Sequence, residues 1–455
     1  MKKQIILFTL ITFNSIIKSQ NFAGGYLHTI FICSDSTVKT SGYNIYGQLG
    51  NGNNLDSNLP TTVNSLSSVI AVAGGYGHSL ALKKNGTVWS WGLNDRGQLG
   101  NGNNINSNFP VQVNSLTGII SIAVGHSHSM ALKNDGTIWL WGKNNRGQLG
   151  IGNNLDSNVP VQIGTLTSII SISGGIDHSL ALKNDGTVWS WGWNFHGQLG
   201  NGNNLDSNIP VAVNNLSGII KIARGGLHSA CLALKNDGTL KSWGRGIYGE
   251  LGNNTTSSSN IPVSVISLTN ITSISGGASN FVALKNNGDV YTWGYGPNGE
   301  LGNGNNLSSS TPILISSLNG VVAIASGAGH SIALKNNNSI LIWGYNYTGQ
   351  LSTGNNNNSN IPITPLGLCQ ITTSINIIND KVIVSIYPNP SGNNIQLNTE
   401  ANFNSIEIIN SLGQLVLKQN FTNSISIENL NSGIYFINLL DNQNKLIATK
   451  KFIKE

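Results

Sequence analysis

The chain has 455 residues, enough for two or three domains, and only 9% of them are charged. Asn, Ser and Gly supply most of the polarity, which favours a β-rich surface with many turns and argues against an ion-pair-rich helical protein. The formal charge of +6 falls to +3 without Lys2, Lys3 and Lys18, since 21 basic residues then face 18 acidic ones. The remaining Lys and Arg form no run, so no nucleic-acid partner is expected.

The N-terminus has the layout of a secretory signal peptide. Lys2 and Lys3 precede an apolar stretch from Ile5 to Ile17, and a polar Lys-Ser-Gln segment follows. We expect residues 1–19 to be removed after Ser19. The apolar stretch is too short to span a bilayer and no other run approaches it, so the mature protein is expected to have no membrane span.

One sequence motif recurs seven times along the chain. Its anchor residue recurs every 50 residues, with one step of 52, at His28, His78, His128, His178, His228, Asn280 and His330. A proline keeps the same spacing at Pro60, Pro110, Pro160, Pro210, Pro262, Pro312 and Pro362. Self-similarity at this period predicts a repeat architecture, and about 40–50 residues is the size of one four-stranded propeller blade.

Each repeat is predicted to form four short strands. In the third copy, Ile119–Ala123 leads to a Gly turn, and two alternating segments flank the hairpin turn Asn134–Gly136. Pro110 marks an outer strand, where a missing N–H is tolerated. The first copy retains only Asn21–Ala23 before its Gly pair, and the last copy ends after Pro362. We therefore expect the final strand to complete the first blade and close the ring.

The repeat resembles the regulator-of-chromosome-condensation (RCC1-like) family. The matching signature is Gly-x-x-His-Ser-x-Ala-Leu, then Gly-x-Val-x-x-Trp-Gly-x-Asn, then Gly-Gln-Leu-Gly, over about residues 21–370. The resemblance implies an all-β, seven-bladed β-propeller, which we assign to residues 20–370. The copies depart from the signature at Ser41, Glu250, Glu300 and Ser352.

A different pattern begins after a linker at residues 371–381. Short alternating strands over residues 382–455 predict a small Ig-like β-sandwich. The Tyr387–Pro390 start, the Gly433-x-Tyr435 motif and the basic C-terminus resemble the type A sorting domain of the type IX secretion system. The resemblance implies a Bacteroidetes-type bacterium, contact with the type IX secretion machinery, and a protein that is secreted or displayed on the outer-membrane surface. A generic Ig-like accessory domain is the alternative.

The repeated residues predict structural roles. Equivalent His side chains belong to separate blades and cannot share one ion, so we expect hydrogen bonds that lock blades together, and no metal site or cofactor. The second Trp of each Trp-x-Trp pair persists and is expected in the core, whereas the first drifts and is expected to be half-exposed. The chain has three cysteines and no CxxC motif. We expect either three unrelated free thiols or a disulfide clasp between Cys33 and Cys369 that leaves Cys231 free.

The distribution of acidic residues does not indicate catalysis, and we expect neither an enzyme nor a catalytic residue. Most propeller carboxylates recur with the repeat, in hairpin turns or Asn-rich loops. The exceptions Asp35, Asp95, Asp177 and Asp289 are not close neighbours in sequence. The Asn-rich loops carry too few negative ligands for calcium.

The copies diverge between Trp-Gly and Gly-Gln-Leu-Gly, in loops expected to share one face of the disc. Tyr, Trp and Arg dominate protein-binding hot spots. We therefore expect these residues to be exposed and to bind a protein or glycan: Tyr43, Tyr46, Arg96, Arg146, Trp193, Phe195, His196, Arg245, Tyr248, Tyr295, Tyr345 and Tyr347. The alternatives are tolerated drift in surface loops, guanine-nucleotide exchange by family analogy, and an extracellular glycan-active enzyme.

Overall fold

The computed structural model describes residues 21–224, 229–370, 384–389, 391–399, 403–410, 415–441 and 446–455. The chain divides into two compact units, one up to Thr372 and one from Thr373. The expected signal peptide at residues 1–19 and linker at 371–381 lie outside the described residues. Every element in the described ranges is a β-strand.

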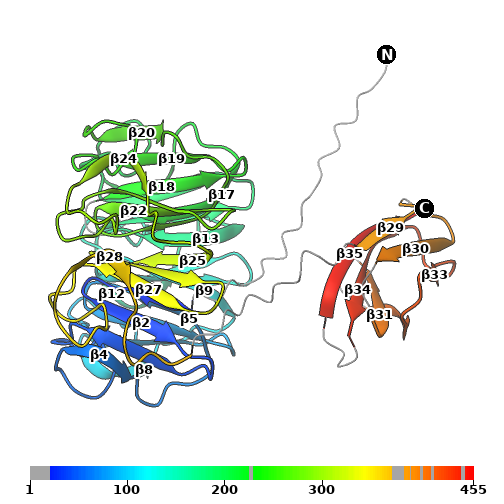
Figure 1. Ribbon diagram of the computed structural model, residues 1–455, viewed down its shortest axis with the longest axis horizontal. Coiled ribbons are helices and arrows are strands. Elements are labelled where there is room, and N and C mark those ends of the chain that lie inside the picture. Colours follow the sequence, from blue (N-terminus) through cyan, green and yellow to red (C-terminus); the bar gives the residue numbers. More distant parts are fainter. Residues whose placement is uncertain are drawn as a thin grey trace. The chain divides into compact units, whose positions relative to one another are not determined.

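Seven four-stranded antiparallel sheets form the first unit, as the repeat predicts (Figure 1). Blade 1 comprises β1 (Phe22–Gly24), β2 (His28–Ile32), β3 (Val38–Gly42) and β4 (Ser57–Thr62). Blade 2 comprises β5 (Val69–Gly74), β6 (His78–Lys83), β7 (Val88–Gly92) and β8 (Ser107–Gln112). Blade 3 comprises β9 (Ile119–Val124), β10 (His128–Lys133), β11 (Ile138–Gly142) and β12 (Ser157–Gln162). Blade 4 comprises β13 (Ile169–Gly174), β14 (His178–Lys183), β15 (Val188–Gly192) and β16 (Ser207–Ala212).

Blade 5 comprises β17 (Ile219–Arg224), β18 (Ala230–Lys235), β19 (Leu240–Gly244) and β20 (Ser259–Ser264). Blade 6 comprises β21 (Ile271–Gly276), β22 (Asn280–Lys285), β23 (Val290–Gly294) and β24 (Ser309–Leu314). Blade 7 comprises β25 (Val321–Ser326), β26 (His330–Lys335), β27 (Ile340–Gly344) and β28 (Ser359–Ile363). The first strands of successive blades contact one another, so they line the axis of the ring. The fourth strand of each blade lies at the edge of its sheet, where its proline is tolerated.

Buried residues of the repeat join each blade to its neighbour. His78 Nε2 lies 3.0 Å from Ser129 Oγ of the next blade, and Trp91 Nε1 donates to the Gln48 carbonyl of the preceding blade at 2.8 Å. The same contact recurs at His28, His128, His178 and His330, and Cys231 Sγ is the partner of His178. The expected blade-locking role of the histidines and the core position of the second Trp are both confirmed. The first Trp of each pair is half-buried, as expected.

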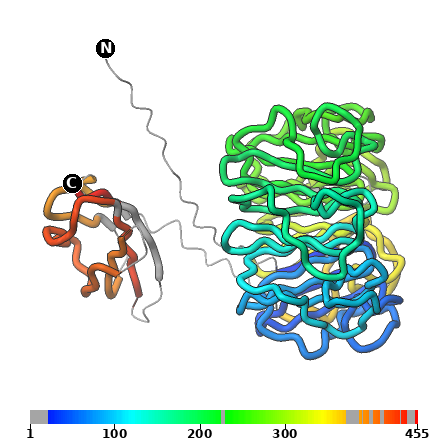
Figure 2. Tube along the Cα trace, turned by 180° about the vertical axis from the view of Figure 1, so that it is seen from behind, coloured from blue at the N-terminus to red at the C-terminus, as the bar shows by residue number. Residues whose placement is uncertain are grey.

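The ring closes by packing, and the expected sharing of a strand is wrong. Strand β28 pairs with β27 of its own blade, while β1 pairs with β2 and completes blade 1. Three residues are enough for this short inner strand. Blades 7 and 1, yellow and blue in Figures 1 and 2, lie side by side. Their seam repeats the contacts of other blades, with Thr29 Oγ1 2.8 Å from His330 Nε2 and the Ala328 N–H donating to the Gly25 carbonyl at 2.9 Å.

A disulfide between Cys33 and Cys369 crosses this seam, with a Cα–Cα distance of 5.5 Å. Beside it, the Ser34 N–H donates to the Gln370 carbonyl at 2.8 Å. The prediction of a clasp is confirmed, and the interpretation of these two cysteines as unrelated thiols is wrong. Cys231 is free and buried.

The second unit is a small sandwich of two antiparallel sheets. One sheet contains β29 (Val384–Tyr387), β30 (Asn394–Thr399) and β33 (Ser424–Ser426). The other contains β31 (Ser405–Asn410), β32 (Leu415–Asn420), β34 (Gly433–Leu440) and β35 (Leu446–Lys454). Apolar side chains of both sheets, among them Ile395, Ile406 and Phe452, form its core. The Asn389 side chain of the Tyr-Pro-Asn-Pro motif accepts a hydrogen bond from the Ile453 N–H at 3.0 Å, which ties the start of the unit to its last strand. Nothing in the described part of the chain is a helix able to cross a membrane.

Candidate binding face

The divergent loops are built on a rigid frame. In blade 2 the third strand ends at Gly92, whose φ of 101° suits glycine. The Asn94 side chain then donates to the carbonyls of Asn103 and Ile105 and accepts from the Leu99 N–H at 2.9 Å. This buried amide fixes the long loop, so the variable positions on either side of it are held in place.

All seven divergent loops leave the same edge of their sheets. In six blades the anchor residue that begins the second strand pairs with the glycine that ends the third, as His78 does with Gly92. In blade 5 this position is held by Ala230, which pairs with Gly244, and not by the expected anchor His228, which lies outside the described residues. The turn between strands one and two and the divergent loop after strand three therefore lie at one end of the blade. We call this side of the disc the loop face; the Asn-Gly and Asp-Gly hairpins form the opposite hairpin face.

The predicted site residues differ in exposure. Phe195 and Tyr347 are 67% and 71% exposed, and Arg96 and Arg146 are also exposed. The half-buried members are Tyr43, Tyr46, Trp193, His196, Tyr248, Tyr295 and Tyr345. Arg245 is buried, so the expectation that it is exposed is wrong. Its guanidinium lies over the Tyr248 ring at 4.9 Å and within 3.9 Å of the Glu250 carboxylate, which replaces the usual Gln.

One group of aromatic residues surrounds the axis on the side of blades 7, 1, 2 and 3. Tyr76 lies 4.8 Å from Tyr26 and 4.2 Å from His126 between ring centroids, the second pair being stacked. Tyr46 packs against Tyr76 at 6.4 Å and against Tyr43 at 6.1 Å. We call these residues, with Tyr345, the axial cluster: Tyr26, Tyr43, Tyr46, Tyr76, His126 and Tyr345.

Sequence reasoning missed Tyr26, Tyr76 and His126. They occupy the position two residues before the anchor histidine, on the turn between the first and second strands. The signal was present, because this position also varies among the copies, with Ile176, Ala278 and Ala328 elsewhere. Divergence of the longer loops alone does not identify this second set of turns.

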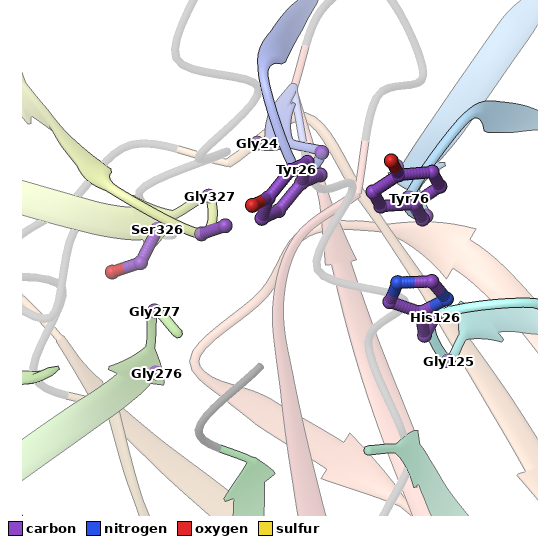
Figure 3. Close-up of a pocket in the computed structure, with 13 residues that line it drawn as sticks. Gly24, Tyr26, Tyr76, Gly125, His126, Gly276, Gly277, Ser326 and Gly327 are labelled. Carbon is purple, nitrogen blue, oxygen red and sulfur yellow. The ribbon is translucent and has the colours of Figure 1, made fainter. Parts of the chain in front are cut away.

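These turns line a narrow opening at the axis (Figure 3). Its volume of about 30 Å³ has room for one or two water molecules. Tyr26, Tyr76 and His126 lie along one side, and Gly276, Gly277, Ser326 and Gly327 lie along the other. The opening is therefore bordered by aromatic rings on one side and mainly by glycine backbone on the other.

A second aromatic group lies on blades 4, 5 and 6. The Trp193 and Phe195 rings are stacked at 6.2 Å, and His196 contacts both. Tyr248 contacts Tyr295 of the next blade at 4.8 Å. Buried carboxylates underlie this group, because Glu250 and Glu300 replace the repeat glutamine; burial raises the pKa of both. On blade 7 the Tyr345 ring stacks on Tyr347 at 6.4 Å between centroids, and Tyr345 also interacts with Tyr26 of blade 1.

Three cations of the loop face, Arg96, Lys143 and Arg146, are paired with acids. Arg96 reaches Asp95 and Asp156, and Arg146 reaches Asp206 at 3.3 Å. Lys143 lies 3.1 Å from Asp177 of the next blade, whose carboxylate also accepts from Gln148 at 2.9 Å. Two of the carboxylates that depart from the repeat, Asp95 and Asp177, are thus engaged in ion pairs. No three acidic, His or Cys side chains in the described ranges gather as a metal site would require.

The seven repeated sheets and the appended sandwich define a β-propeller protein with a separate C-terminal domain. The family model described as RCC1-like domain matches residues 56–377, and the chain belongs to this family. The model described as secretion system C-terminal sorting domain matches residues 385–455. This sorting domain, which belongs to the type IX system, indicates export to the cell surface or secretion.

Solved structures agree with the fold. The crystal structure of human WBSCR16 is 25% identical, with a TM-score of 0.66 over 72% of this chain and 93% of that one. Yeast RCC1 (Prp20), crystallised with Kap60, is 21% identical, with a TM-score of 0.65 over 82% of this chain and 92% of that one. No curated protein matches the chain in sequence. The RCC1-like propeller is generally a regulatory and binding fold.

Proposed function

We propose that the protein is an exported binding protein, which holds a protein or glycan ligand on the loop face of its propeller. The observation that carries this proposal is the distribution of departures from the repeat. Residues shared by the copies lock the blades together. Aromatic residues that differ between copies lie on one face in two separate groups, and rings contact one another within each group. Aromatic side chains supply large contact area at low entropic cost.

The sorting domain supports a ligand outside the cell or on its surface. Guanine-nucleotide exchange, the alternative by family analogy, requires a GTPase inside the cell, whereas the sorting domain indicates export. A glycan-active enzyme needs a pair of free carboxylates at suitable spacing. On this face Asp95, Asp156, Asp177 and Asp206 are engaged with cations, Glu250 and Glu300 are buried, and Asp56 accepts from the Asn44 N–H at 2.7 Å.

The experiment compares three variants of the full chain. Phe195→Ala and Tyr347→Ala each remove one of the exposed rings, and Lys84→Ala removes an exposed side chain from the hairpin face as a matched control. Ligands are selected with the wild-type protein from outer-membrane proteins and from a glycan array, and each bound ligand is tested for turnover. We expect at least one loop-face variant to lose about tenfold in affinity while all three keep the wild-type melting temperature. Binding that depends on Lys84 alone, or turnover of the ligand, would contradict the proposal.

A further inference from the structure

The axial opening has two unlike halves. On blades 1 to 3 the rim carries Tyr26, Tyr76 and His126, whereas blades 6 and 7 carry Ala278 and Ala328 at the equivalent position. Figure 3 shows the Tyr26 hydroxyl end directed into the opening, towards Gly327 and Ser326. We call Tyr26, Tyr76 and His126 the aromatic wall. The glycine floor is the facing backbone of Gly276, Gly277, Gly327 and Ala328.

The wall is held rigidly by the backbone. The Tyr26 N–H donates to the Gly75 carbonyl at 2.8 Å, the Tyr76 N–H to the His126 carbonyl at 2.9 Å, and the His126 N–H to the Gly175 carbonyl at 3.0 Å. Each bond joins one blade to the next. A ligand that packs against these rings meets a preformed surface, so little conformational entropy is lost on binding.

The aromatic rings of the wall are amphipathic, and its two phenols are neutral. Its rings offer apolar faces, and their hydroxyls can donate and accept hydrogen bonds. Burial raises the pKa of Tyr26 and Tyr76, so the phenols stay protonated at neutral pH. Arg96, Lys143 and Arg146 of the same face are engaged with acids. Nucleic acids need cations available for phosphates, so stacking of bases is disfavoured here.

The lining of the opening also limits the partner. Protein hot spots are anchored by large side chains that fill well-packed pockets. Beside the three rings this opening is lined mainly by glycine backbone, so few side-chain atoms are available to enclose such an anchor. The surface suits a ligand with flat C–H faces that lies across the rim and presents hydroxyls to it.

We propose that the axial cluster binds a neutral hexose unit of a glycan, with an aliphatic face of the sugar on Tyr26 and its hydroxyls bonded to neighbouring phenols and to backbone of the glycine floor. This inference rests on the proposed function and names the ligand class. The second aromatic group on blades 4 to 6 is not part of this sugar site, because none of its rings lines the axial opening.

The test uses the full chain in native gels that contain soluble polysaccharides. The neutral probes are a mixed-linkage β-glucan, a galactomannan and dextran; the charged probes are polygalacturonate and heparin. We expect at least one neutral probe to retard the wild-type protein, with little change in 0.5 M NaCl. Tyr26→Ala and Tyr76→Ala should weaken this binding about tenfold, whereas Tyr26→Phe keeps most of it. Lys84→Ala should bind as wild type.

The repeat itself supplies variants that are compatible with the turn. Ala stands at the position of Tyr26 in blades 6 and 7 and Ile in blade 4, so Tyr26→Ile gives a second test with an apolar side chain that has no ring. No retardation by any neutral probe, unchanged binding by all ring-deleting variants, or retardation by charged probes alone would overturn the inference. If Phe195→Ala abolishes capture of a protein while the neutral probes give no retardation, the sugar site falls and the proposed function stands.

Discussion

Two tryptophans of blade 4 lie two residues apart and serve different purposes. Trp191 is fully buried, and its Nε1 donates to the Gln148 carbonyl of blade 3 at 2.9 Å. Trp193 is half-buried on the loop face, where it contacts Phe195 and His196. The difference follows from the strand, which ends at Gly192 between them.

We therefore predict opposite effects of truncation. Trp191→Ala should lower the free energy of unfolding by about 3–5 kcal/mol, because it removes a large core side chain and an inter-blade hydrogen bond. Trp193→Ala should change it by less than about 1 kcal/mol and, if Trp193 is an anchor, weaken ligand binding by about 2 kcal/mol. Chemical denaturation and a binding titration of both variants give the comparison. Equal destabilisation by the two variants would show that Trp193 belongs to the core.

Glu300 is a buried acid at a position where five other blades have Gln. Its Oε2 accepts from the Asn298 N–H and its Oε1 from the Asn298 side chain, both at 2.8 Å. Burial raises its pKa above the ordinary 4.5. The native state therefore holds a proton that the unfolded chain has lost, so stability from this group is present below pH 4.5 and falls as pH rises towards the native pKa.

Glu300→Gln restores the residue of the other blades and removes this dependence. The variant should gain stability relative to wild type as pH rises from 4 to 7, with the smallest difference at pH 4. Unfolding free energies of both proteins at the two pH values measure it. A difference that is constant with pH would mean that Glu300 titrates alike in the folded and unfolded chain.

At the scale of elements, one histidine joins the last blade to the first. His330 Nε2 of β26 pairs with Thr29 Oγ1 of β2, and that hydroxyl donates to the Gln350 carbonyl at 2.8 Å. Burial lowers the pKa of His330 to about 4 and that of His28 to about 3. Below pH 6.5 these histidines become protonated in the unfolded chain but stay neutral in the native state. The seam therefore loses stability as pH falls towards 4.

The chain already carries Asn280 at the equivalent position of blade 6, which makes His330→Asn a conservative probe. We predict a loss of about 1–2 kcal/mol at pH 7.5, because the inter-blade hydrogen bond is removed. Between pH 7.5 and 4.5 the variant should then lose less stability than wild type, as shown by denaturant titrations at both pH values. If the two proteins lose equal stability on acidification, His330 does not contribute to the acid sensitivity.

How far the sequence predicts an element depends on whether its signal is local. The hairpins at Asn134–Gly136 and its equivalents follow from adjacent residues, and the structure has them where the pattern puts them. Closure of the ring is a long-range property, and the sequence gives no measure of how short an inner strand can be. The three residues of β1 suffice, so the expected shared strand is absent.

The same contrast applies to the candidate site. Divergence between copies finds the loops, but it does not tell which variable side chains meet. Arg245 turns inward because Glu250 offers it a buried partner, a pairing that neither residue reveals alone. Tyr26 and Tyr76 stand 50 residues apart and come into contact because blades 1 and 2 pack side by side around the axis.

For the whole molecule, the seam between blades 7 and 1 has no shared strand and depends on packing, a few hydrogen bonds and one covalent link. Cys33 and Cys369 are separated by 336 residues, so their disulfide closes nearly the entire propeller into a loop. Cross-links over long loops restrict the unfolded chain most strongly. Such a bond forms in an oxidising compartment, which agrees with an exported protein.

We predict that Cys33→Ser/Cys369→Ser lowers the free energy of unfolding by about 2–5 kcal/mol. Reductant should bring wild type to the same stability and leave the double variant unchanged, because burial raises the pKa of the Cys231 thiol and keeps it unreactive. Hydrogen exchange should accelerate first in β1, β2 and β25 to β28, while β13 to β16 on the far side of the ring keep their protection. Uniform loss of protection around the ring would mean that the propeller opens as one cooperative unit and that the clasp does not act at the seam.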